Sequence, residues 1–196
     1  MVFIVDHNVP SDCPKTAASQ KKMRDFAKEN NIDFWEGKGV CHQIMMENYV
    51  CPGELIFGAD SHTCSYGALG AFGTGVGCTD LLYGMVTGKS WVLVPETVKF
   101  NLVGKLPEGV YARDLILTII GTIGANGCNY QVMEFTGEGA KTLSISERMV
   151  LCNMAVEAGA KTGIFEPDEK AIEYLEAHGR KPKALFKSDP DAVYAR

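Results

Sequence analysis

The sequence lacks several patterns that would assign a chain directly to a class of protein. Its 196 residues include seven cysteines, but no two are spaced as CxxC, so neither a zinc ribbon nor a thioredoxin-type site is indicated. No apolar run approaches the roughly eighteen residues that a membrane-spanning helix requires. The start, MVFIVDHNVP, lacks the charged and long apolar regions of a signal peptide. These absences favour a protein of the reduced cytoplasm, without a membrane partner, whose cysteines are mostly small buried side chains.

Basic residues are also too few and too scattered to indicate a nucleic-acid partner. The net charge is −5 at pH 7, and phosphate binding requires clustered lysine and arginine. The densest basic run, at 178–187, is expected to be a solvated loop near the C-terminus. With 46% hydrophobic and 22% charged residues, the chain has the composition of a soluble globular protein of one ordinary domain, with or without a tail.

Short apolar runs alternate with helical patterns along the whole chain. Strands are expected at residues 2–5, 32–35, 53–60, 91–94, 97–104, 130–135 and 162–165. Helices are expected at residues 11–30, 79–88, 111–124, 144–160 and 167–179. This alternation predicts an α/β protein with three layers, helix, sheet and helix. A soft boundary near Gly179 is expected to separate the α/β segment 1–178 from a connecting or terminal segment 179–196.

Three of the four histidines lie at the expected end of a strand or in an expected loop. Three carboxylates also lie near the expected ends of strands. The histidines are His7, His42 and His62, and the carboxylates are Asp6, Asp60 and Glu134. In open α/β sheets, ligand sites form at the carboxyl ends of the strands. A histidine held by a carboxylate keeps one tautomer and binds a proton more tightly, which suits a general acid. The grouping therefore indicates an acid–base site.

Two other interpretations of these residues remain open. Each Asp-His or Asp-Ser-His motif taken alone is more often structural than catalytic. Three histidines and a carboxylate could also bind zinc, although the spacing of positions 7, 42 and 62 contains no HxH or HxxxH pair.

Glycines are concentrated directly after the Asp60-Ser61-His62 motif. They occupy positions 67, 70, 73, 75 and 77. The run GTGVG at 73–77 precedes an expected helix and could hold a phosphate on its backbone N–H groups, but it does not have the GxGxxG spacing of a dinucleotide site. We favour close packing, in which the missing side chains let the backbone approach another group.

Five motifs together make the chain resemble the large subunit of the aconitase superfamily, in the branch of 3-isopropylmalate dehydratase and homoaconitase. In order, they are DHNVP, GVCHQ, PGELIFGADSHTCSYGALGAFGTGVGCTD, MEFTGEG and SERMVLCNMAVEAGAKTGIFEPDE. The resemblance extends from residue 3 to about residue 175, so it implies an incomplete aconitase-like α/β/α domain.

The resemblance implies a hydro-lyase that acts on a hydroxy di- or tricarboxylic acid, as in leucine biosynthesis. Such enzymes dehydrate the substrate to an alkene and rehydrate it, with a [4Fe-4S] cluster as Lewis acid. Histidine–carboxylate pairs assist, and the implied pairs are His7 with Asp6, His42 with Asp60, and His62 with Glu134. His7 would help to protonate the departing hydroxyl, and Ser61 would contact a substrate carboxylate.

This sequence departs from the family in ways that limit what it is expected to do alone. Cys64 and Ser65 stand where aconitases have Pro-Asn, which makes citrate a less suitable substrate. The SCTN-type and CxxC-type motifs that carry the family's cluster ligands are missing, so no metal ligand is expected in this chain. The mobile domain is expected on a separate small subunit. An inactive remnant that binds carboxylates or a partner is the alternative.

Overall fold

The computed structural model describes residues 1–196, and the chain divides into two compact units. Residues 1–45 form the first unit, and residues 46–196 form the second. Residues beyond Gly179 belong to the second unit, where Arg180 donates hydrogen bonds to the carbonyl oxygens of Met46 and Val50. The boundary expected at residue 179 stays a prediction. None of the helices is long and apolar enough to cross a membrane.

The first unit is a small parallel sheet with one helix packed against it. Strand β1 (Val2–Val5) pairs in parallel with β2 (Asp33–Glu36), and α1 (Pro14–Glu29) connects them. The helix begins at a proline, as is common for first helical positions, because proline has no N–H to leave unpaired. The stacked rings of Phe3 and Phe26 join the helix to β1, so this unit has an apolar contact of its own.

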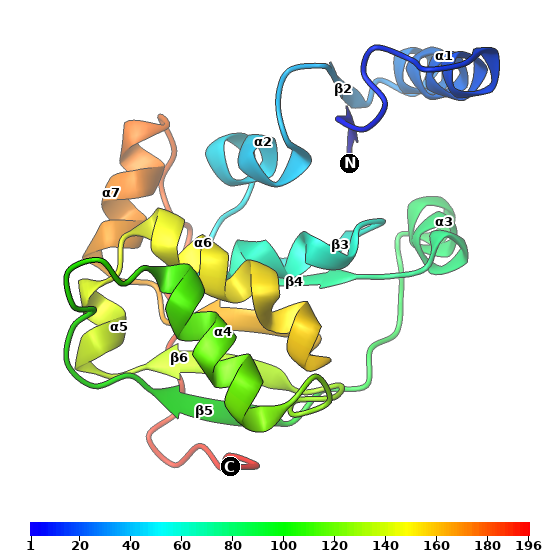
Figure 1. Ribbon diagram of the computed structural model, residues 1–196. Coiled ribbons are helices and arrows are strands. Elements are labelled where there is room, and N and C mark those ends of the chain that lie inside the picture. Colours follow the sequence, from blue (N-terminus) through cyan, green and yellow to red (C-terminus); the bar gives the residue numbers. More distant parts are fainter. The chain divides into compact units, whose positions relative to one another are not determined.

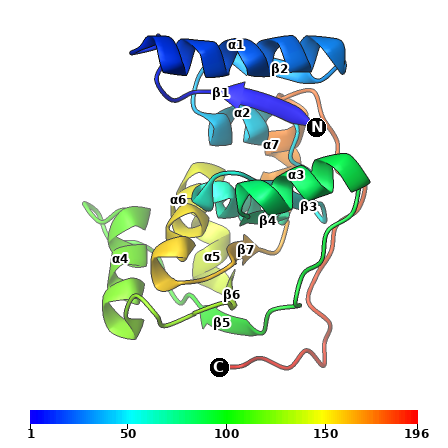
Figure 2. The same ribbon diagram turned by 90° about the vertical axis from the view of Figure 1, so that its right-hand side faces the viewer.

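The second unit is built around a parallel sheet of three strands. Strand β6 (Val132–Thr136) lies between β5 (Thr97–Asn101) and β7 (Thr162–Phe165). Helices α4 (Ala112–Ile123) and α6 (Ile145–Asn153) cover one face of this sheet, while the C-terminal segment runs on the other side (Figures 1 and 2). The remaining helices of the chain are α2 (Cys41–Asn48), α3 (Cys78–Thr87), α5 (Glu138–Thr142), α7 (Glu169–Ala177) and the 3-10 helix η2 (Met154–Ala158).

The buried face of this sheet is aromatic and holds one buried ion pair. The rings of Phe135 and Phe165 stack 5.1 Å apart on neighbouring strands. The guanidinium of Arg148, on α6, lies over Phe165 and donates two hydrogen bonds to Asp168, at 2.9 and 2.5 Å. Because Asp168 is also the N-cap of α7, this ion pair joins α6 to α7 across the edge of the core.

The glycine-rich stretch forms a second parallel sheet and the 3-10 helix that connects its strands. Strand β3 (Leu55–Gly58) pairs with β4 (Phe72–Gly75), and η1 (Ser61–Leu69) lies between them. A Cβ at Gly67 would overlap the carbonyl oxygen of Gly163 on β7, and a Cβ at Gly73 would overlap the carbonyl oxygen of Thr63. Close packing against the chain's own backbone is the interpretation that this geometry supports.

The alternation of helices and parallel strands confirms the α/β class, although some of the expected elements differ. The strands form three separate small parallel sheets. Residues 91–94 form no strand, because no neighbouring strand pairs with them. The helix expected at 144–160 is two helices, α6 and η2. Helix α6 begins with a capping box, in which Ser144 and Glu147 satisfy each other's backbone N–H groups.

Candidate functional site

In the first unit, Asp6 holds both the imidazole of His7 and the start of α2. Nδ1 of His7 lies 2.7 Å from Oδ1 of Asp6, and the backbone N–H of Cys41 donates to Oδ2 at 2.6 Å. Burial alone would raise the pKa of the Asp6 carboxyl, but the hydrogen bonds from Cys41 and His7 outweigh it and hold that pKa below its usual range. Asp6 is therefore an ionised carboxylate at neutral pH, as a histidine partner should be.

His42 lies in the first turn of the same helix, directly after Cys41. The carboxylate of Asp6 thus receives one N–H from the helix start that carries His42 and one contact from His7. This places two of the expected histidines on adjoining elements of one unit. The pairing of His42 with Asp60 joins the two units, and it stays a prediction.

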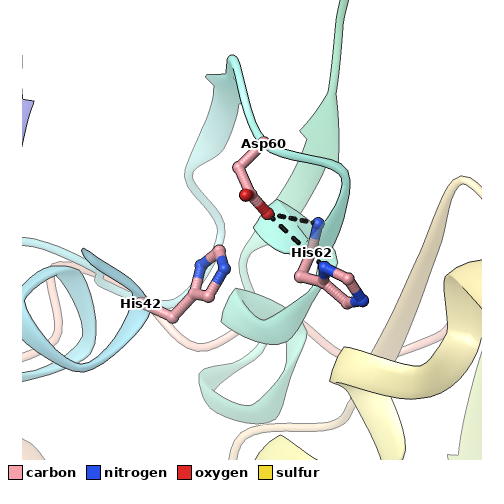
Figure 3. Close-up of side chains that lie close together, drawn as sticks. All are labelled: His42, Asp60 and His62. Atoms are coloured by element: carbon pink, nitrogen blue, oxygen red, sulfur yellow. Dashed lines mark hydrogen bonds and ion pairs between the residues drawn. The ribbon is translucent and has the colours of Figure 1, made fainter. Parts of the chain in front are cut away.

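In the second unit, the loop between β3 and η1 holds His62 through its own neighbours. Asp60 is the N-cap of η1, and its Oδ1 accepts the backbone N–H of His62 at 2.7 Å (Figure 3). The same oxygen lies 3.6 Å from Nδ1 of the imidazole, and Oγ of Ser61 lies 3.3 Å from that nitrogen. Both neighbours therefore contact His62, although Asp60 was expected to hold His42 and Ser61 to contact a substrate carboxylate.

The carboxylate on the far side of His62 is Glu157, which the sequence did not indicate. Nε2 of His62 lies 3.3 Å from Oε1 of Glu157, on η2. The imidazole therefore has one carboxylate near each ring nitrogen. These two contacts fix the orientation of the ring, as is needed for a histidine that transfers a proton.

The expected pairing of His62 with Glu134 is wrong, because Glu134 has other partners. Its Oε1 accepts hydrogen bonds from the hydroxyls of Ser188 and Tyr194, at 3.0 and 3.1 Å. Successive side chains on a strand point to opposite faces, so Glu134 faces the C-terminal segment while Phe135 faces the core. Glu157 replaces Glu134 as the partner of His62.

Buried polar groups join η1 to the junction of α6 and η2, and so position His62 beside Glu157. The amide of Asn153 donates to Oγ of Ser65 at 2.9 Å, and that hydroxyl donates to the carbonyl of His62 at 2.7 Å. The thiol of Cys64 donates to the carbonyl of Asn153 at 3.4 Å. Ser65 and Cys64 are both buried, so these bonds are shielded from water and have few alternatives.

The cysteines do not fit an iron–sulfur cluster within these residues. No group of three or more close metal-ligating side chains includes a cysteine. Burial raises the pKa of the Cys64 thiol to about 12 and raises the pKa of Cys128 and Cys152 as well, which opposes the thiolate form that a metal binds. The two exposed thiols, Cys13 and Cys78, belong to different units.

Carboxylate-held histidines on an α/β scaffold are the features of an acid–base site, and comparison with known proteins identifies its class. A model of the aconitase family (aconitate hydratase) matches residues 3–194, so the chain belongs to the aconitase family. Enzymes of this family are [4Fe-4S] proteins.

Within this family, the chain is similar to curated large subunits of 3-isopropylmalate dehydratase. The chain is 52% identical over 195 residues to a probable 3-isopropylmalate dehydratase large subunit of Methanothermobacter thermautotrophicus, covering 98% of this chain and 46% of the relative. It is 52% identical over 198 residues to 3-isopropylmalate dehydratase large subunit 1 of Pyrococcus furiosus, covering 99% and 47%. The large subunit of Hydrogenobaculum sp. is 50% identical, with 99% and 46% covered. The chain thus spans about half the length of the curated relatives it matches.

Proposed function

We propose that this chain supplies the histidine–carboxylate part of a hydro-lyase large subunit. The reaction is dehydration of a hydroxy di- or tricarboxylic acid, such as 3-isopropylmalate, to an alkene, and hydration of such an alkene, of which homoaconitate is an example. The observation that carries the proposal is the placement of His62 between Asp60 and Glu157, in a chain about half identical to 3-isopropylmalate dehydratase large subunits.

The proposed chemistry rests on proton transfer by these histidines. Hydroxide is a poor leaving group, and a positioned acid that protonates it contributes roughly 10²–10⁴-fold to the rate. His7, held at 2.7 Å by an ionised Asp6, is the proposed donor to the departing hydroxyl. His62 exchanges a proton with substrate and is held by Glu157 and Asp60. Ser61 is proposed to contact a substrate carboxylate, and His42 to be held by Asp60.

The complete enzyme needs groups that we place outside these 196 residues. The [4Fe-4S] cluster of the family supplies Lewis acidity toward the hydroxyl when bound, and we propose that its cysteine ligands lie in the other part of a full-length large subunit. A small subunit is the proposed partner, since the relatives are named as large subunits. The cytoplasm is the proposed location.

A chimera tests this proposal directly. The matching 195 residues of the Methanothermobacter large subunit are replaced by this chain, and the product is combined with that organism's small subunit and a reconstituted cluster. We expect the chimera to dehydrate 3-isopropylmalate, followed by the ultraviolet absorbance of the alkene product. A folded, cluster-loaded chimera without activity on any hydroxy di- or tricarboxylic acid would favour the inactive remnant.

Substitutions in the active chimera test the roles of the individual residues. His62→Ala and His7→Ala are each expected to lower kcat by about 10²-fold or more, the scale of lost acid–base catalysis. Glu157→Gln is expected to lower kcat and to shift the pH profile of kcat. Glu134→Gln is the matched control and should have the smaller effect, because Glu134 accepts hydrogen bonds from Ser188 and Tyr194 of the C-terminal segment. A larger effect at Glu134 than at Glu157 would contradict our assignment of the carboxylate.

A further inference from the structure

Helix α3 is apolar but buries none of its residues. Its sequence, CTDLLYGMVT, has three large apolar side chains within one turn of one face, and all three are exposed. The exposed fractions are 57% for Leu82, 56% for Tyr83 and 77% for Val86. A helix in a globular protein normally presents such a face to a core, and within residues 46–196 this face covers no core.

The segment that follows α3 continues this apolar surface. Trp91, Leu93 and Val94 are 79%, 65% and 85% exposed, in a run with the composition of a strand but no strand partner. The helix and this segment lie apart from α4 and α6, which cover the three-stranded sheet of the same unit (Figures 1 and 2). We call the six side chains together the α3 surface; they are Leu82, Tyr83, Val86, Trp91, Leu93 and Val94.

The charges around the α3 surface exclude most classes of partner. Between residues 81 and 95 the only charged side chain is Lys89. Nucleic acids and anionic membranes are bound through clustered basic residues, which this stretch does not have. Large exposed apolar patches on soluble proteins mark sites where another protein surface packs. The composition of the α3 surface therefore favours a partner that presents an apolar protein surface.

We propose that the α3 surface is covered by the half of a full-length large subunit that this chain does not contain. The relatives are about twice as long as the region they share with this chain, which covers only 46% to 48% of each. Contacts between the domains of one chain resemble protein–protein interfaces, and the α3 surface offers the exposed apolar side chains that such a contact buries. The inference rests on family membership and relative length, and it is independent of the proposed reaction.

The test is association of this chain with the missing half. Residues 1–196 are co-expressed with the tagged remainder of the Methanothermobacter large subunit, and the complex is isolated through the tag. We expect Val86→Glu and Trp91→Glu to lower recovery of the complex by about tenfold or more, because a charge is then placed in an apolar contact. Val103→Glu is the matched control, since Val103 is 78% exposed and Val86 is 77% exposed.

Fluorescence reports the contact from this chain's own side. The protein has two tryptophans, so Trp35→Phe leaves Trp91 as the single emitter. We expect its emission to move to shorter wavelength and its quenching by acrylamide to fall in the complex. Val86→Glu should leave the melting temperature of residues 1–196 unchanged, because Val86 makes no buried contact in them.

Three outcomes would overturn the proposal. The first is recovery of the Val86→Glu complex equal to that of Val103→Glu. The second is a dimer of residues 1–196 that Val86→Glu abolishes, which would assign the surface to a second copy. The third comes from the intact relative, where glutamate at the position aligned with Val86 should lower the melting temperature by about 5 °C or more. An unchanged melting temperature there would contradict the inference even if the separate halves fail to associate.

Discussion

Replacing Gly67 with alanine should destabilise the second unit strongly, because the added methyl group has no room. A Cβ at this position would overlap the carbonyl oxygen of Gly163, and it would lie 2.7 Å from that carbonyl carbon and 3.0 Å from Cα of Ile164. These atoms belong to the backbone of β7, so no side-chain rotation can move them away. Either η1 or β7 must shift from its place in the core.

The size of the effect follows from two opposing terms. Overpacking of a core commonly costs about 1–3 kcal/mol, and a clash with backbone falls at the upper end of that range. Alanine restricts the unfolded chain more than glycine and so recovers about 0.4–1 kcal/mol. The net loss is about 2 kcal/mol, which corresponds to a fall in melting temperature of about 4–8 °C for a protein of this length.

Urea unfolding followed by circular dichroism measures this loss, and Gly121→Ala is the matched control. Gly121 lies in α4, and a Cβ there meets no atom within 4 Å. Because alanine is the better helix former, the control should gain about 0.5–1 kcal/mol. If Gly67→Ala unfolds within about 0.5 kcal/mol of the wild type, the packing argument for the glycine run fails.

Three further predictions concern charge, thiols and iron. Burial alone would raise the pKa of the Asp168 carboxyl, but the Arg148 guanidinium holds it below the ordinary value of 3.8. The ion pair therefore stabilises the fold fully above pH 3.8, and it stabilises the fold less as the pH falls through the pKa of the folded state. Asp168→Asn should therefore cost about 3 kcal/mol at pH 7 and progressively less below pH 3.8 in urea titrations; a constant difference would contradict this. A thiol reagent should label Cys13 and Cys78 rapidly and buried Cys64 only on unfolding, as mass spectrometry of the labelled peptides would show. Anaerobic treatment of residues 1–196 with iron and sulfide should leave no stable cluster absorbance, and a stoichiometric, stable cluster would refute the placement of the ligands elsewhere.

The pattern of apolar residues was sufficient to predict most strands of this fold. It was insufficient where a segment forms a strand only if a neighbouring strand is available to pair with it. The runs VFIV and TGIF each form a strand, because each has a parallel neighbour. The run WVLV has the same composition, yet it forms no strand since no neighbour is available. Conversely, β4 was missed because FGTG has glycine at alternate positions, and glycine is normally depleted in strands. Pairing depends on distant residues, so local composition cannot report it.

In the candidate site too, contacts between near neighbours in the sequence were easier to predict than contacts between distant residues. The contact of Asp6 with His7 joins adjacent residues, and the Asp-His motif indicated it. The contact of Asp60 with His62 is equally local, but Asp60 was expected to hold His42 and His62 to pair with Glu134. Glu157 lies 95 residues from His62, outside any local pattern. Strand alternation was a usable warning against Glu134, since it stands between two apolar residues that face the core. The error over the partner of His62 therefore arose where the pair crosses between elements that are distant in the sequence.

The glycines of β4 connect the packing to the chemistry. A Cβ at Gly75 would lie 2.7 Å from the carbonyl oxygen of Asp60 and 2.9 Å from Cα of Ser61. Those two residues begin η1, and the Asp60 side chain holds the N–H of His62 from there. Any side chain on β4 at this point would push the start of η1 outward and carry the imidazole away from Glu157, which is held separately on η2. The bare backbone after the Asp-Ser-His motif is thus a condition for the histidine to reach its distant carboxylate.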